Sequence, residues 1–291
     1  MASPFHCIGL IGRYADPSIQ LTLKALSDYL KQRRLRVILD ESTAELLPGH
    51  GLETGSRALI GEHCDLVIVI GGDGTLLNAA RSLIGYDVSL LAINRGRLGF
   101  LADISPGEMM EKLDAVLQGS YTEEDRIMLR AAIEREGECI SGSDALNDVV
   151  VHKWNVARMI EFETYVNDHL VHTHRSDGMI VATPTGSTAY ALSSGGPILH
   201  PALNAIVLVP VCPHTLSNRP IVVDGDSRVE IRVKDGSQSA QVTCDGQIGL
   251  SLASGDLIKI RRKDKKIRLL HPPGHDYYRV LRAKLHWGGK L

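Results

Sequence analysis

Residues 65–75, DLVIVIGGDGT, decide the fold of the first part of the chain. The apolar run in its first half predicts a strand buried on both faces, and the LLNAARSLIG that follows the glycines predicts a helix. Around this unit, short apolar runs at 7–11, 36–39 and 89–93 alternate with amphipathic stretches, the clearest of them at 18–34. This β-α-β order predicts a mostly parallel sheet with helices on both faces.

From Arg126 the pattern changes to short runs rich in β-branched residues and separated by Gly, Asp, Asn and Pro. Helical periodicity is nearly absent there, which predicts an antiparallel, sandwich-like β-domain. Residues 277–285, YYRVLRAKL, predict a helix after the breaker run HPPGH. We therefore expect an α/β domain at 1–125, a β-rich domain at 126–270, and a C-terminal segment at 271–291 that packs back on the first domain.

Composition restricts the classes of function. The 291 residues carry a formal net charge of -2, so no basic footprint indicates a nucleic-acid partner. The five cysteines are scattered and form no C-x-x-C pair, which indicates reduced thiols. No basic region precedes the short apolar run at the N-terminus, and no window approaches the roughly 18 apolar residues of a membrane helix. We expect a cytoplasmic protein that contacts neither nucleic acid nor membrane.

The glycine loop Gly71–Thr75 is the strongest chemical signal. It places bare backbone at the carboxyl end of a parallel sheet, where ligands bind in open α/β folds. Glycine lets amide N–H groups approach phosphate oxygens, and the next helix turns its positive end to the same point. Asp73 would repel phosphate unless it holds Mg²⁺ or accepts the proton of an attacking hydroxyl. The alternative is a tight turn with Asp73 as the helix N-cap.

A second loop, 183–196, combines hydroxyls, glycines and one tyrosine after the apolar run MIVA. Its small donors and acceptors suit a ribose, an amide or a flat base, although a Ser/Thr-rich surface loop has the same composition. Asn147-Asp148 precedes the run VVVH, where an Asx-type turn is the alternative to a binding role. The stretch 175–178, RSDG, also precedes a strand and reads equally as a turn with an exposed ion pair.

The histidines give weaker signals. His172 and His174 share one face of a predicted strand, a spacing that metal sites use, but no third ligand accompanies them. His271 and His275 flank two prolines, which predicts a loop. No Ser-His-Asp arrangement can be read from the sequence.

Several motifs occur together in the order of one family. They are GGDGTLLNAAR at 71–81, INRGRLGFL at 93–101, ND at 147–148, RSDG at 175–178, TPTGSTAYALSSGGPIL at 183–199 and PHTLSNRP at 213–220. Over nearly its whole length the sequence resembles the bacterial NAD kinase family, Gram-negative type. The GGDG loop alone is shared with phosphofructokinases and with diacylglycerol and sphingosine kinases, and the stretch at 183–199 favours NAD.

The resemblance implies an α/β N-terminal domain of the phosphofructokinase and diacylglycerol-kinase type, with a mostly parallel sheet. It implies a β-rich, sandwich-like C-terminal domain, and an active site in the crevice between the two. The implied reaction is the ATP-dependent phosphorylation of the adenosine ribose 2′-hydroxyl of NAD to give NADP. A divalent cation, Mg²⁺ by preference, and a homodimer or homotetramer built through the β-domain are implied as well.

The resemblance also assigns roles by position. Asp73 is the general base, with Mg²⁺ held beside it by phosphates, and Gly74 lines the phosphate loop. Asn147 and Asp148 grip a ribose of the dinucleotide. The full set assigned to substrate binding is Asp73, Gly74, Asn147, Asp148, Arg158, Arg175, Asp177, Thr188, Ala189, Tyr190, Ala191, Leu192, Ser193 and Gln247.

One departure and two alternatives remain open at this point. The family usually has Asn-Glu where this chain has Asn147-Asp148, so the carboxylate here is one methylene shorter. A lipid or sugar kinase could use the same GGDG loop, although no basic or apolar membrane-facing stretch is evident. A non-catalytic dinucleotide sensor could keep the binding loops, although it would be expected to have lost the acid at Asp73.

Overall fold

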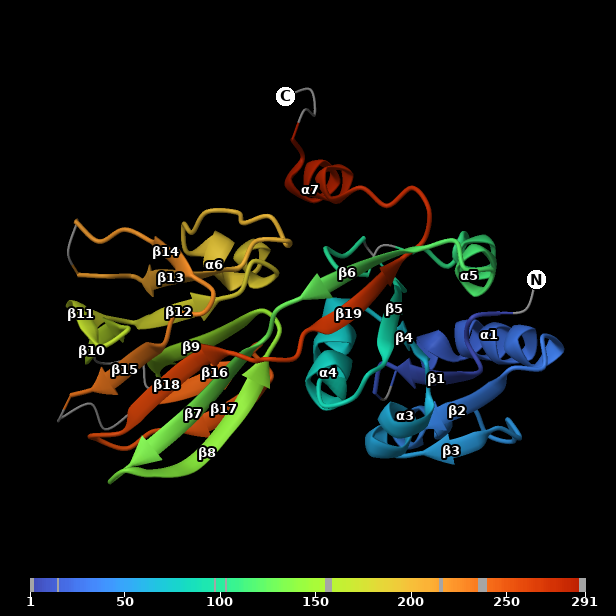
Figure 1. The fold of residues 1–291 in the computed structure, drawn as a ribbon, viewed down its shortest axis with the longest axis horizontal. Coiled ribbons are helices and arrows are strands. Elements are labelled where there is room, and N and C mark those ends of the chain that lie inside the picture. The colour runs from blue at the N-terminus through green and yellow to red at the C-terminus, as the bar shows by residue number, and fades with distance from the viewer. Residues whose placement is uncertain are drawn as a thin grey trace. The chain divides into compact units, whose positions relative to one another are not determined.

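The computed structural model describes residues 3–14, 16–96, 98–102, 104–154, 159–214, 217–234 and 240–287 (Figure 1). The chain forms two compact units. Unit 1 contains Met1–Asp125 together with Ile267–Leu291, and unit 2 contains Arg126–Lys266. The last stretch of the chain therefore belongs with the first 125 residues.

Unit 1 is built on a seven-stranded sheet in the order β3-β2-β1-β4-β5-β19-β6. The pairings from β3 across to β19 are all parallel, as the alternating sequence pattern predicts. The strands are β1 (Cys7–Gly12), β2 (Arg36–Asp40), β3 (Glu53–Gly55), β4 (Leu66–Ile70), β5 (Ser89–Ile93), β6 (Thr122–Arg126) and β19 (Ile267–His271).

Helices of unit 1 pack on this sheet through apolar faces, most clearly α1 (Gln20–Gln32) and α5 (Met109–Leu117). Leu23, Leu26 and Leu30 of the first long helix are fully inaccessible to solvent and pack in the same core as β1 and β4. The helices are η1 (Pro17–Ile19), α1 (Gln20–Gln32), α2 (Glu41–Ala44), α3 (Arg57–His63), α4 (Asp73–Leu83), α5 (Met109–Leu117) and α7 (Tyr277–Leu285).

Unit 2 contains two six-stranded sheets whose recorded pairings are antiparallel. The first has the order β11-β10-β15-β18-β7-β8, with β7 (Leu129–Arg135), β8 (Glu138–Ala145), β10 (Ile160–Val166), β11 (His169–Ser176), β15 (Val229–Val233) and β18 (Leu257–Arg262). The second has the order β14-β13-β12-β9-β16-β17, with β9 (Asp148–Lys153), β12 (Gly178–Ala182), β13 (Ala205–Val211), β14 (Ile221–Asp224), β16 (Ala240–Cys244) and β17 (Ile248–Ser251).

Side chains from both sheets form the main core of unit 2, as expected of a sandwich. The second sheet is buried on its other face too. Val149 and Val151 of β9 face the main core, whereas Val150 joins a smaller core with Ala191 and Leu199. That second core explains why β9, β12 and β13 read as continuous apolar runs instead of alternating ones. It also fixes the segment that contains η2 (Gly186–Thr188) and α6 (Tyr190–Ser193) against the sheet.

The structure corrects the sequence prediction for His271. We expected a loop there, but His271 is the last residue of β19 and is buried, with 4% of its surface exposed. Pro272 ends the strand directly after His271. The run HPPGH therefore begins with the last residue of a strand, which its prolines and glycine conceal in the sequence.

Candidate active site

Unit 2 contains a pocket of about 600 Å³ that runs along β9 and is bordered by β16 and by the residues just before β12 and at the end of β13. This volume is typical of sites for drug-sized or nucleotide-sized ligands. Five of the predicted residues line it: Asn147, Asp148 and Asp177 at the starts of β9 and β12, and Ala189 and Tyr190 at the start of α6. The complete lining is Asn147, Asp148, Val150, His152, Lys153, Asp177, Ala189, Tyr190, Val211, Cys212, Gln241, Thr243, Asp245 and Gly246.

Two carboxyl groups lie together at one side of the pocket. Asp148 is the first residue of β9 and is buried, with 4% of its surface exposed. Burial, with the nearby carboxylate of Asp245 adding to it, raises the pKa of Asp148 to about 7. An acid of this kind is partly protonated at neutral pH, so it can donate a hydrogen bond as well as accept one.

Asp245 fixes the backbone at the start of β9. Its carboxylate accepts hydrogen bonds from the backbone N–H groups of Leu146 (3.2 Å), Asn147 (2.7 Å) and Asp148 (3.3 Å). Its own N–H donates to the backbone oxygen of Asp148 at 2.9 Å. Asp245 and Gly246 both have positive φ, 52° and 62°, in the tight turn between β16 and β17. The turn therefore aims a carboxylate at the backbone that presents Asn147 and Asp148.

A polar wall is fixed by contacts within unit 2. Nδ1 of His152 lies 2.9 Å from the backbone oxygen of Lys153, and its Nε2 lies 2.9 Å from Nε2 of Gln241. These distances fit a ring with its proton on Nδ1 and an acceptor at Nε2. Nζ of Lys153 forms an ion pair with Asp177 at 2.6 Å. The wall thus offers both signs of charge to a ligand.

The hydroxyls of the loop after β12 serve the fold more than the pocket. Thr183 donates to the backbone oxygen of Leu146 at 2.6 Å, and Ser187 donates to that of Pro184 at 2.6 Å. Thr185 accepts from the buried guanidinium of Arg126 at 3.1 Å. The sequence left open whether these hydroxyls contact a ligand; in the structure they shape the loop, which presents Ala189 and Tyr190 to the pocket.

Gly186 allows this loop to pack directly against the backbone of Asn147. A Cβ at this position would lie 2.0 Å from the backbone oxygen of Asn147 and 2.4 Å from its carbonyl carbon. The backbone N–H of Thr183 donates to the same oxygen at 2.9 Å. The glycine is needed for this close approach because any side chain would displace the Asn147 backbone.

The remaining predicted residues lie outside the pocket lining or outside the described residues. Arg158 belongs to the latter group. Arg175 is exposed on β11, and Ser193 and Gln247 are exposed as well. Thr188 and Leu192 are half-buried, and Ala191 is fully buried in the smaller core of unit 2.

In unit 1, the glycine loop leads directly into α4. Gly72 is the N-cap and Asp73 is the first helical residue, so Asp73 is not the N-cap itself. Gly71 packs against Thr75, since a Cβ there would lie 2.3 Å from its hydroxyl oxygen. Around Gly72, by contrast, a Cβ would meet nothing within 4 Å. The backbone therefore lies open at Gly72, at the positive end of the helix, as an anion site requires.

The Asp73 carboxylate has a second set of partners that the sequence did not reveal. It accepts hydrogen bonds from three successive backbone N–H groups, those of Phe100 (2.8 Å), Leu101 (3.1 Å) and Ala102 (3.0 Å). Gly99 makes the approach possible, since a Cβ there would lie 2.1 Å from Oδ1 of Asp73. The GFL part of the motif, residues 99–101, therefore binds and orients the Asp73 carboxylate.

Helix α7 fixes the same loop from another direction. Nζ of Lys284 donates to the backbone oxygen of Leu98 at 2.8 Å and lies 5.3 Å from the ring centroid of Phe100. Sequence reasoning placed α7 on the first domain but did not connect it with the glycine loop. It also missed Asp245, His152 and Gln241, although the Asp-Gly pair before an apolar run is a recognisable turn signal.

Comparisons with known proteins identify the family. The family model of the ATP-NAD kinase N-terminal domain matches residues 8–121, and that of the C-terminal domain matches residues 146–271. An NAD kinase of Pseudomonas putida (strain W619) is 55% identical over 288 residues, covering 99% of this chain and 97% of its own length. An NAD kinase of Pseudomonas entomophila (strain L48) is 54% identical with the same coverage.

Solved structures show the same fold. A yeast NADH kinase complexed with NADH superposes with a TM-score of 0.89 at 25% identity, covering 99% of this chain and 89% of its own. An NAD kinase from Archaeoglobus fulgidus in complex with ATP gives a TM-score of 0.75 at 26% identity, covering 96% and 98%. With both family models matched and relatives aligned along nearly its whole length, the chain belongs to the ATP-NAD kinase family.

Proposed function

We propose that the pocket of unit 2 binds NAD through its adenosine ribose and that Asp73 is the general base for phosphorylation of the 2′-hydroxyl. As a member of the ATP-NAD kinase family, the protein is a phosphotransferase. The observation that supports the site best is the buried carboxyl of Asp148, in a pocket that also presents an aromatic ring. The related yeast NADH kinase was solved with NADH and the Archaeoglobus NAD kinase with ATP, which supports both ligands.

Asp148 is suited to a ribose because a ribose hydroxyl both donates and accepts. With a pKa of about 7, the Asp148 carboxyl can offer either role as the ligand requires. The neighbouring Asn147 adds an amide, and Tyr190 offers an exposed ring on which a base could stack. In this proposal the shorter acid of Asp148 replaces the usual glutamate of the family, because β9 already brings it into the pocket wall.

Asp73 would accept the proton of the 2′-hydroxyl as its oxygen attacks the γ-phosphorus of ATP, with ADP as the leaving group. An ionised carboxylate offers about four acceptor positions, and three amides occupy three of them here. One position remains for the hydroxyl. The three amides would also hold the carboxylate in one orientation, which favours a reaction that depends on positioning.

The open backbone at Gly72 and the positive end of α4 would receive phosphate oxygens. A divalent cation with hard oxygen ligands, Mg²⁺ by preference, would be held beside Asp73 by phosphate oxygens of ATP and by water, because the last acceptor position of the carboxylate is needed for the hydroxyl. Such a cation supplies neutralisation of the charge on the transferred phosphoryl group.

We further propose that the protein is cytoplasmic and assembles as a homodimer or homotetramer. The five cysteines are thiols and not disulfides, as is common in the reducing cytoplasm. Leu170 and Val171 of β11 are exposed, 55% and 40%, and give unit 2 apolar surface for a homodimer or homotetramer.

The pocket assignment is tested with Tyr190→Ala and the control Tyr278→Ala. Both tyrosines are about half exposed, 47% and 57%, but only Tyr190 lines the pocket. Loss of stacking on a base is expected to weaken NAD binding by about 1–3 kcal/mol, or roughly 5- to 150-fold in KM, with little change in the KM for ATP.

A coupled assay of NADP formation from ATP, Mg²⁺ and NAD measures these constants. Equal KM values for NAD in Tyr190→Ala and Tyr278→Ala would show that the pocket does not bind NAD. A wild type that binds NAD by calorimetry but forms no NADP would instead indicate a dinucleotide sensor.

A further inference from the structure

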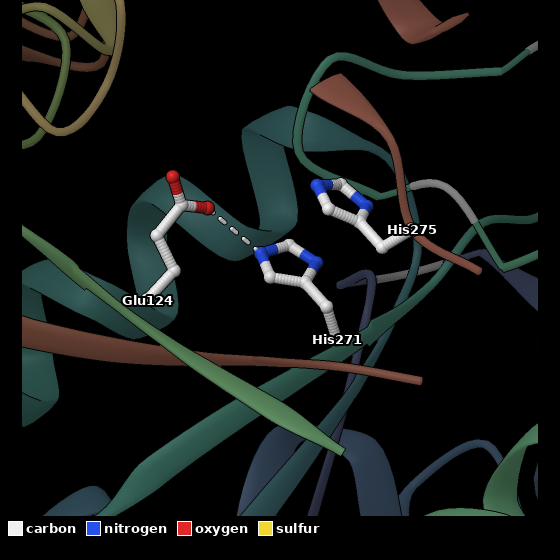
Figure 2. Close-up of side chains that lie close together, drawn as sticks. All are labelled: Glu124, His271 and His275. Atoms are coloured by element: carbon white, nitrogen blue, oxygen red, sulfur yellow. Dashed lines mark hydrogen bonds and ion pairs between the residues drawn. The ribbon is translucent and has the colours of Figure 1, made fainter. Parts of the chain in front are cut away.

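Unit 1 contains a cluster of metal-binding side chains that the kinase reaction does not use. Among the described residues, Glu124, His271 and His275 are the group of three whose ligand atoms all lie within 4.8 Å of one another. Figure 2 shows the carboxylate of Glu124 pointing to Nε2 of His271, with the ring of His275 beside that of His271. The oxygen and nitrogen are 2.9 Å apart, and the two ring centroids are 3.7 Å apart.

The three residues come from elements that hold them together. Glu124 lies on β6 and His271 ends β19, and the two strands are neighbours in the sheet. His275 follows after Pro272, Pro273 and Gly274, the last with a φ of 84°. The spacing of three residues between the histidines is also common in metal sites.

The turn between the histidines is fixed from within and from outside. The N–H of His275 donates to the backbone oxygen of Pro272 at 3.3 Å. Nζ of Lys112, on α5, donates to the backbone oxygen of Pro273 at 3.1 Å. Two prolines further restrict the backbone, so less conformational entropy would be lost when His271 and His275 bind one ligand together.

The donor set selects the class of ion. Two imidazoles and one carboxylate suit Zn²⁺ and similar transition metals, whereas Mg²⁺ prefers oxygen ligands in an octahedral arrangement. Of the three acidic residues of β6 only Glu124 faces buried His271, since Glu123 and Asp125 form ion pairs with Arg268, so the cluster provides one carboxylate for a cation. The cluster is therefore chemically unlike the hard-oxygen site at Asp73.

We propose that Glu124, His271 and His275 bind one divalent transition-metal ion of the Zn²⁺ class, with a fourth position open to water. Ligand atoms around tetrahedral zinc lie roughly 3.3 Å apart, so the three groups must draw together by up to about 1.5 Å. The rings, now inclined by 19°, must tilt apart, and the metal replaces the proton shared by Glu124 and His271.

The bound ion would connect β6 to the turn that leads into α7. Parallel pairing places the end of β19 at the same edge of the sheet as the end of β4, where the glycine loop begins. Two strand spacings separate them, roughly 10 Å. The metal site is thus a second cation site on the carboxyl edge of the unit 1 sheet, beside the phosphate loop.

The test uses the metal-free full-length chain and two probes, Co²⁺ for its visible spectrum and Zn²⁺ for calorimetry. His275→Ala and Glu124→Gln remove one ligand each. His63→Ala is the matched control, because His63 is an exposed histidine on α3 of the same unit. Thermal unfolding with and without Zn²⁺ adds a measurement that does not depend on catalysis.

We expect one equivalent of Co²⁺ with a tetrahedral-type spectrum in wild type and in His63→Ala. We expect affinity to fall by at least the roughly 10- to 100-fold that loss of a supporting group costs in other metal sites, in both ligand variants. Zn²⁺ should raise Tm in wild type and not in His275→Ala. Wild type that binds no stoichiometric Co²⁺, ligand variants that bind like wild type, or displacement of Co²⁺ by millimolar Mg²⁺ would each overturn the proposal.

Discussion

Replacing Asp148 with asparagine should remove a pH dependence from the stability of unit 2. The buried carboxyl has a pKa of about 7 in the folded protein, against 3.8 in its unperturbed state. Because the folded state holds the proton more tightly than the unfolded state, this group contributes stability that is fully present below about pH 4. The contribution is lost as pH rises through about 7.

The size of the effect follows from the same two pKa values. A difference of about three pKa units corresponds to about 4 kcal/mol, lost at up to about 1.4 kcal/mol per pH unit. The amide in Asp148→Asn has a similar shape and no titrating proton. The variant should therefore gain in stability relative to wild type between pH 4 and 7, and the gain should reach a plateau above about pH 8.

Hydrogen–deuterium exchange of the β9 and β16 amides reports on unit 2 alone. The ratio of wild-type to Asp148→Asn exchange rates, taken at each pH, cancels the intrinsic pH dependence of exchange. We expect that ratio to rise by up to about tenfold per pH unit across this range. Asp168→Asn is the matched control, since Asp168 is an exposed aspartate of the same unit with 72% of its side chain accessible. A ratio for Asp148→Asn that stays constant from pH 4 to 8 would refute the reasoning.

Two glycine substitutions separate the two parts of the site. Gly99→Ala places a Cβ 2.1 Å from Oδ1 of Asp73 and should displace the carboxylate, lowering kcat by roughly 10²-fold while NAD binding stays as in wild type. An unchanged kcat would show that the backbone contacts of the Asp73 carboxylate are not needed for catalysis. Gly186→Ala places a Cβ 2.0 Å from the backbone oxygen of Asn147, which should destabilise unit 2 by at least about 2 kcal/mol and weaken NAD binding at least tenfold. Calorimetry that finds wild-type affinity for NAD would contradict this packing argument.

The sequence predicts well those elements whose burial leaves a periodic or continuous pattern of apolar residues. β4 and β5 read as apolar runs because both faces of the sheet are covered, and α1 shows a regular apolar face. Two of the elements that were missed, β6 and β8, lack such a pattern. β6 reads TEEDR because only Arg126 is buried in it, and β8 has mostly exposed or half-buried side chains.

The helix α5, the short elements α2 and β3, and the strands β17 and β19 were also not predicted. Most of them are brief, so tertiary contacts decide their conformation more than local periodicity does. β19 is the informative case. It closes the unit 1 sheet from the far end of the chain, and parallel pairing across such a sequence distance leaves no local signal.

The candidate residues that stand out in the sequence belong to motifs with their own local chemistry. Asn147, Asp148 and Tyr190 line one pocket and Gly72 leaves open backbone at α4, while their roles in binding stay predictions. The partners of these residues could not be predicted. The amides that hold the Asp73 carboxylate lie 27–29 residues further along the chain. Only the folded chain brings such groups together.

The central claim is that Asp73 acts in catalysis while unit 2 binds NAD, and Asp73→Asn tests it most directly. NADP formation and NAD binding are measured side by side in wild type, in Asp73→Asn and in Asp87→Asn, a control acid in unit 1 with 93% of its side chain exposed. The account predicts that Asp73→Asn loses roughly 10²–10⁴-fold in kcat and keeps its affinity for NAD, with Asp87→Asn unchanged. A variant of Asp73 with near-normal kcat would contradict the account.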